Sequence, residues 1–129
     1  MSFPKMQPKV LFAEYANFLA VVLVASAFCL EAFAFSQTKY GTFNGRDWST
    51  KLNVSTFSVS GSIGYNGTNN DRVMVHHAVV SDWGYYVDND FGKRIANFYC
   101  GPSGERIERA TAEYYINNTL IKAYNNVTP

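Results

Sequence analysis

The chain has 129 residues, which is enough for one domain or for a membrane anchor followed by a small domain. Its net charge of +1 gives no strong field for nucleic acid, and its two cysteines exclude a disulfide-rich secreted scaffold. Hydrophobic residues are unevenly spread, because only Glu14 and Glu31 are charged between Val10 and Ser36. The remainder of the chain is therefore distinctly polar.

Residues 1–9 are predicted to be a short N-terminal tail, and residues 10–36 a single transmembrane helix. From Val10 to Phe35 such a helix would be about 39 Å long, enough to cross the ~30 Å hydrocarbon core of a bilayer with some tilt. Two other interpretations are a signal peptide, whose apolar region is usually about 7–15 residues long, and a buried core helix, which needs a surrounding domain. Glu14 and Glu31 lie near the two ends, where each carboxylate reaches headgroups or water, or makes a polar contact in the membrane.

The predicted helix carries a stripe of small residues in a heptad pattern, with alanine recurring every seven residues. Helices in lipid associate through small residues, because these let the two backbones approach closely. We therefore expect this face to bind other membrane-protein subunits, while the rest of the helix contacts the lipid bilayer. The residues of the predicted helix-packing interface are Ala13, Ala16, Ala20, Leu23, Ala27, Leu30 and Ala34.

Residues 37–51 are predicted to be a linker, because this stretch carries two glycines and an Asn-Gly pair. After it, apolar residues alternate with polar ones, which is typical of strands in an antiparallel sheet. A glycine interrupts the first alternating run and predicts one long or bulged strand there. The predicted strands cover residues 52–65, 72–80, 85–87 and 93–100, with a turn at 88–92.

An amphipathic helix is expected from about residue 104 to residue 123. Ser103 is a candidate N-cap, and apolar residues follow it at helical spacing. Residues 52–129 are therefore predicted to form a small soluble head with a helix on one face of its sheet. The expected fold class is α+β: one N-terminal transmembrane helix, a small antiparallel sheet and a C-terminal amphipathic helix.

The titratable residues form no recognisable catalytic motif. His76 and His77 are neighbours on a predicted strand and point to opposite faces, so they cannot easily bind one metal together. The sequence contains no nucleophile elbow and no glycine-rich phosphate loop. We therefore expect no enzyme activity, no cofactor, no metal, no small-molecule substrate and no nucleic-acid partner.

N-x-S/T sequons occur in the predicted head and are candidate N-glycosylation sites if the head faces the lumen or the cell exterior. A further sequon at Asn126 is handicapped by the terminal position and by Pro129. Lysine and arginine flank the apolar segment on both sides, so the positive-inside rule gives no orientation. The candidate acceptors are Asn53, Asn66 and Asn117.

The layout of an apolar N-terminal span and a small polar head resembles the single-span accessory subunits of mitochondrial respiratory complexes. This resemblance covers the overall layout and no motif. It implies a non-catalytic role in the structure or assembly of a multi-subunit membrane complex, as a respiratory-chain accessory subunit of the mitochondrial inner membrane.

The stretch from Val10 to Glu14, VLFAE, resembles the start of mature type IV pilins, a group that includes archaeal filament subunits. A pilin cut before Val10 would have Glu14 as its fifth residue, as the family prefers, although Lys9 stands where the processing peptidase expects glycine. As an alternative to the respiratory role, this resemblance implies an extracellular filament, with a hydrophobic N-terminal helix in the filament core and a β-rich head outside.

Overall fold

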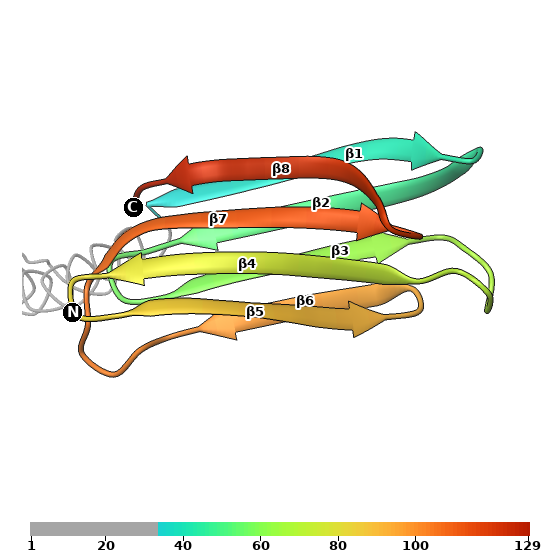
Figure 1. The fold of residues 1–129 in the computed structure, drawn as a ribbon. Helices are drawn as coiled ribbons and strands as arrows, with labels where there is room; N and C mark the ends of the chain where they lie inside the picture. The colour runs from blue at the N-terminus through green and yellow to red at the C-terminus, as the bar shows by residue number, and fades with distance from the viewer. Residues whose placement is uncertain (1–33) are drawn as a thin grey trace, which may run out of the picture. The chain divides into compact units, whose positions relative to one another are not determined.

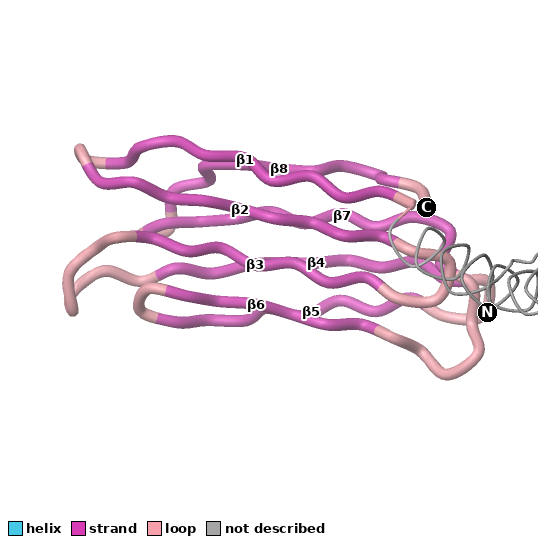
Figure 2. The backbone as a smooth tube through the Cα atoms, turned by 180° about the vertical axis from the view of Figure 1, so that it is seen from behind, coloured by secondary structure: helices cyan, strands magenta, loops and turns pink. Residues whose placement is uncertain are grey.

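The computed structural model describes residues 34–129, which form two four-stranded antiparallel sheets stacked as a sandwich (Figure 1). Sheet A has the strand order β1-β2-β3-β6, and sheet B has the order β5-β4-β7-β8. The strands of both sheets follow roughly the same long axis (Figure 2). Their bounds are β1 (Phe35–Phe43), β2 (Arg46–Val54), β3 (Val59–Tyr65), β4 (Val73–Ser81), β5 (Tyr85–Gly92), β6 (Ile95–Cys100), β7 (Ile107–Ile116) and β8 (Thr119–Val127).

The α+β fold class is wrong, because residues 34–129 contain strands where a C-terminal helix was expected. The predicted helix at 104–123 is the hairpin of β7 and β8. In β7, alternate residues from Ala110 to Ile116 are buried, which is the period of a strand. The hairpin turns at Asn117 and Asn118, whose φ angles of 49° and 66° lie in the left-handed region that asparagine tolerates.

The predicted linker at 37–51 is also wrong, since it covers most of β1 and the first part of β2. The Asn44-Gly45 pair turns this hairpin with φ angles of 52° and 74°, as the common two-residue hairpin loops require. The single long strand expected over 52–65 is instead the end of β2 and all of β3. Between them, the Ser55 amide donates to the Ser58 carbonyl at 2.8 Å and closes a tight turn.

The strands predicted at 72–80 and 93–100 are confirmed as β4 and β6. The turn predicted at 88–92 is wrong, because β5 continues to Gly92 and pairs with β4 along this whole stretch. Alternate residues of β4 from Val73 to Ser81 are buried against the core between the sheets, so the position of β4 is fixed. A polar stretch is thus held as an edge strand by its neighbour, although its own sequence is typical of a turn.

The core lies between the two sheets and consists mainly of valine, isoleucine, leucine and tyrosine side chains. Tyr114 of β7 is fully buried and reaches across the sandwich, where its hydroxyl donates to the Lys51 carbonyl of β2 at 2.6 Å. Gly61 of β3 leaves room for that hydroxyl: a Cβ there would overlap it and would lie 2.5 Å from the Phe98 ring. Burial raises the pKa of Tyr114, so its hydroxyl remains a neutral donor.

No helix within residues 34–129 is long and apolar enough to cross a membrane. The predicted tail at 1–9 and nearly all of the predicted span at 10–36 lie outside the described residues. The C-terminal end of that span is wrong, because Phe35 and Ser36 belong to β1.

Candidate interaction surfaces

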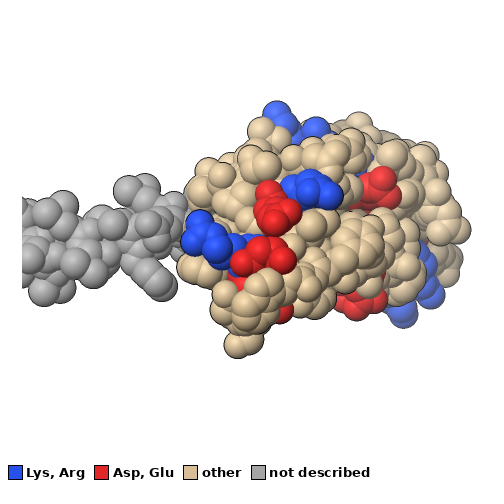
Figure 3. Space-filling model, turned by 60° about the vertical axis from the view of Figure 1, so that its left-hand side comes forward, with Lys and Arg blue, Asp and Glu red and all other residues tan. Residues whose placement is uncertain are grey.

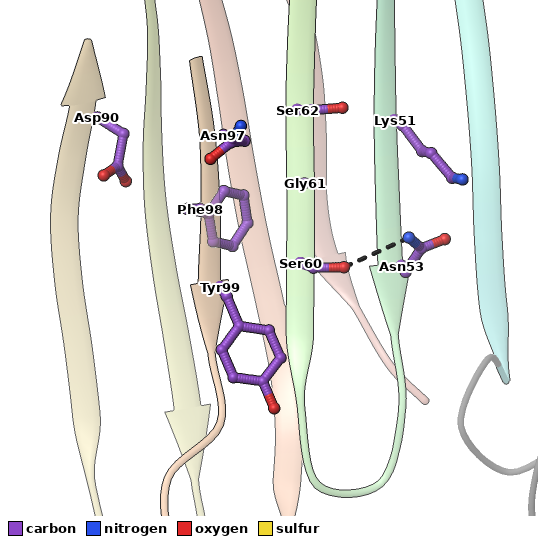
Figure 4. Close-up of a pocket in the computed structure, with 9 residues that line it drawn as sticks. All are labelled: Lys51, Asn53, Ser60, Gly61, Ser62, Asp90, Asn97, Phe98 and Tyr99. Atoms are coloured by element: carbon purple, nitrogen blue, oxygen red, sulfur yellow. Dashed lines mark hydrogen bonds between the residues drawn. The ribbon is translucent and has the colours of Figure 1, made fainter.

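The outer face of sheet A is polar and carries a shallow hollow of about 350 Å³ (Figure 4). Ser60 and Ser62 of β3 turn short side chains toward the hollow, and Asp90 of β5 in sheet B also lines it. On one side the Asn53 amide donates to the Ser60 hydroxyl at 3.3 Å, and Tyr99 stands beside the hollow with 72% of its surface exposed. The lining residues are Lys51, Asn53, Ser60, Gly61, Ser62, Asp90, Asn97, Phe98 and Tyr99.

The lining of this hollow supplies hydrogen-bonding groups but no activated nucleophile. Asn53 also accepts a hydrogen bond from the Ser36 hydroxyl at 2.6 Å. The Asn53 amide thus already bonds to the hydroxyls of Ser36 and Ser60. Among the lining residues no hydroxyl lies in hydrogen-bond contact with a base. The lining of this hollow is therefore a polar surface without the paired nucleophile and base that nucleophilic catalysis needs.

The outer face of sheet B is apolar in large part. Met74 of β4 pairs directly with Phe91 of β5 and with Tyr115 of β7, and Tyr115 pairs with Leu120 of β8. These four side chains form one row across the whole sheet, which we call the apolar row. Phe91 is 71% exposed and Leu120 is 49% exposed. Together with the row, the apolar face of sheet B comprises Ala78, Val80, Tyr85 and Val87.

A polar row crosses the same face next to the apolar row. His76 pairs with Asn89 on one side and with Glu113 on the other. The His76 Nδ1 and Asn89 Oδ1 atoms are 2.5 Å apart, and the Tyr115 hydroxyl donates to Glu113 at 3.0 Å. Because these groups already have partners within the chain, covering the face would desolvate few unpaired polar atoms.

Exposed aromatic residues also mark the end of the sandwich at which β1 begins. Phe57 lies in the β2–β3 turn and Trp83 in the β4–β5 turn, and they are 51% and 79% exposed. The loops at this end are joined, since the Ile107 amide donates to Thr56 and the Asp82 amide to Arg106. On the face shown in Figure 3, basic and acidic side chains are intermingled, so that view shows no strong patch of one sign.

The two histidines lie on opposite faces of β4, as their adjacent positions predict. His77 is buried and stacks on Phe98, with ring centroids 4.0 Å apart. Its Nδ1 has no hydrogen-bond partner and lies 3.6 Å from a carboxylate oxygen of Asp90. Burial lowers the pKa of His77 below its ordinary value of 6.5, against the opposing attraction of Asp90 and Asp88.

Acidification is therefore expected to destabilise the sandwich through His77. Below pH 6.5 the unfolded chain binds this proton before the folded chain does, so stability falls as the pH drops from 6.5 toward the lowered pKa. Urea unfolding at pH 7.5 and pH 5 measures the loss. In His77→Gln the free energy of unfolding should differ less between pH 7.5 and pH 5. The control His76→Gln should keep the difference of the wild-type chain. An unchanged pH dependence in His77→Gln would assign the effect to other groups.

The candidate glycosylation sites differ in their surroundings. The Asn53 side chain is half-buried at the edge of the hollow. The Asn117 amide accepts from the Arg72 backbone at 2.9 Å and donates to Asp71 at 2.8 Å, which lowers the pKa of Asp71. Asn66 is exposed in the loop between β3 and β4. If the head is extracytoplasmic, Asn66 is the acceptor whose modification disturbs the fold least.

Nearly all of the residues predicted to act in the membrane lie outside the part of the chain that the structure describes. Glu14, Glu31 and the predicted helix-packing interface lie outside the described residues, except for Ala34, which is exposed just before β1. Within residues 34–129 no group of three or more His, Cys, Asp or Glu side chains could hold a metal ion.

Sequence reasoning missed the apolar face of sheet B. A signal for it was present, because β4 has apolar residues at successive positions, as in Val73-Met74-Val75 and Ala78-Val79-Val80. A strand with one hydrated face usually alternates apolar and polar residues more strictly.

Comparisons with family models, with curated proteins and with solved structures found no match.

Proposed function

We propose that the chain is a non-catalytic structural subunit of a larger assembly, and that the apolar face of sheet B binds a neighbouring subunit. The observation that carries this proposal is the apolar row, in which four large side chains from four strands share one exposed face. Covering apolar surface contributes about 25 cal/mol per Å². Large exposed apolar patches of this kind mark interaction sites in folded proteins.

Of the two assemblies that the sequence resembles, we favour the filament. A β-rich head is what the pilin resemblance implies, and the described head consists of strands, turns and loops. In this proposal the apolar N-terminal residues contribute to the filament core and the sandwich lies outside. The accessory role in a respiratory complex of the mitochondrial inner membrane is the second candidate, supported by the uncharged stretch from Tyr15 to Leu30.

Met74→Glu in the full chain is expected to weaken assembly strongly, because association would then have to desolvate a carboxylate within the apolar row. Native mass spectrometry after gentle detergent extraction measures the assembly. Ser62→Glu is the matched control, since it places the same charge on the outer face of sheet A. Assembly of Met74→Glu at the wild-type level would contradict a role for the apolar face.

The same measurement on the wild-type chain separates the two assemblies. A homopolymer is expected for the filament subunit. Recovery at one copy with many different subunits would instead support the accessory role.

A further inference from the structure

We infer that the neighbouring subunit on the apolar face is a second copy of this chain, packed face to face about a two-fold axis that runs parallel to the strands between β4 and β7. This inference rests on the proposed function and names the partner of the same surface. It follows from the order of the strands in sheet B, from the register of their pairing and from the hydrogen-bonding groups on the face.

A two-fold axis in this position places each strand opposite a different strand of the second copy. It leaves the position of every residue along the strand direction unchanged. In the order β5-β4-β7-β8, it places β4 on β7 of the second copy and β5 on β8. The apolar row then stacks on itself. Met74 meets Tyr115 of the second copy, and Phe91 meets Leu120 of the second copy. Each side chain of the apolar row thus packs on a side chain of the apolar row of the second copy.

The polar row distinguishes this axis from a two-fold axis that runs across the strands. The axis along the strands places His76 opposite Glu113 of the second copy, and the symmetry makes this contact twice. A two-fold axis that crosses the strands at the level of His77 would place His76 opposite Ala78 and Glu113 opposite Thr111, so no imidazole would face a carboxylate. Hydrogen-bonding groups that complement each other across an interface favour the correct partner and fix its register, so the facing imidazole and carboxylate favour the axis along the strands.

The size of the face is sufficient for a specific contact. With β4 nine residues long and strands about 4.8 Å apart, the face measures about 30 Å by 19 Å, or roughly 570 Å² before side-chain relief is added. Standard interfaces bury about 800 Å² on each partner, so this contact lies at the low end. A contact of this size is strengthened when the same two subunits are also held together elsewhere.

Chemical cross-linking between single cysteines tests the axis in the full chain. In a background without Cys29 and Cys100, both replaced by serine, Phe91→Cys and Leu120→Cys are made separately. Both positions are exposed, so neither variant removes a core side chain. A bis-maleimide with a span of about 10 Å matches the distance expected between facing sheets.

Mixing the two single-cysteine proteins is expected to raise the yield of cross-linked dimer on the order of five-fold over either protein alone, because opposite positions are about 10 Å apart and identical ones about 17 Å. Preferential cross-linking of Phe91→Cys with Tyr85→Cys would overturn the inference in favour of the axis across the strands. An assembly that gives neither cross-link would overturn it while leaving a structural role in place. A full chain that is monomeric throughout would overturn the proposed function as well.

Discussion

Ile63→Ala is expected to lower the free energy of unfolding by about 2–5 kcal/mol, one of the largest effects of any single substitution in the sandwich. Ile63 has no exposed surface and lies on β3, which has a neighbouring strand on each side. The substitution removes buried methylene groups and leaves a cavity that the two packed sheets can fill only in part. Urea denaturation of the full chain, followed by far-ultraviolet circular dichroism, measures the loss.

Ile95→Ala is the matched control for this prediction. Ile95 lies on the neighbouring strand β6 but is 63% exposed on the outer face of sheet A. The same chemical change there should alter the free energy of unfolding by no more than about 0.5 kcal/mol. Equal losses at both positions would contradict the assignment of inner and outer faces in sheet A.

Gly61→Ala is expected to destabilise the sandwich by about 1–3 kcal/mol, although alanine is the smallest possible addition. A Cβ at this position would overlap the Tyr114 hydroxyl and press on the Phe98 ring. Relief of the overlap would displace the hydrogen bond between Tyr114 and the Lys51 carbonyl, which links sheet B to sheet A. The midpoint of urea unfolding reports the effect.

A second substitution separates this steric cause from a general effect of glycine replacement. Tyr114→Phe removes the hydroxyl and should recover part of the stability that Gly61→Ala loses, so the two changes should not be additive. Gly64→Ala is the matched control on the same strand, because its Cβ would meet only the Ser49 hydroxyl at 3.5 Å. Additive losses from the first two changes would show that the hydroxyl does not limit the space at Gly61.

The two outer faces of the sandwich differ in a way that bears on function. Sheet A presents mainly serine, threonine and asparagine, together with the exposed Ile95 and Tyr99, and its hydroxyls and amides form hydrogen bonds such as those of Asn53. Sheet B presents the apolar row and a polar row whose members are paired. Water therefore solvates the first face better than the second. This asymmetry is the physical basis for placing subunit contacts on sheet B.

Prediction of the fold succeeded where the local pattern had one interpretation. The alternation in residues 72–80 and 93–100 is compatible with a strand and poorly compatible with a helix, and both strands are present. It failed at 104–123, where Ile107, Ala110 and Tyr114 fit helical spacing while buried positions from Ala110 to Ile116 fit period two. Pairing with β4 and β8 satisfies the backbone of β7 as a strand, and tertiary contacts of this kind override weak local preferences.

The first hairpin was missed for a different reason. The Asn44-Gly45 pair was interpreted as part of a flexible linker, yet the same pair is a strong hairpin signal when strands flank it. The residues around it are largely polar, because β1 is an edge strand with much of its surface exposed. A polar edge strand carries little hydrophobic pattern of its own, so its partner strand decides its conformation.

By itself, the sequence determined the apolar character of residues 10–36, the existence of β4 and β6, and the placing of His76 and His77 on opposite faces. Only the tertiary structure decided that Tyr114 reaches over Gly61, that His77 is buried, and that the apolar row exists. The reason is that a period of two assigns each residue to one face of its own strand. It says nothing about which residues of distant strands lie at the same height, and that register comes from the pairing of β5, β4, β7 and β8.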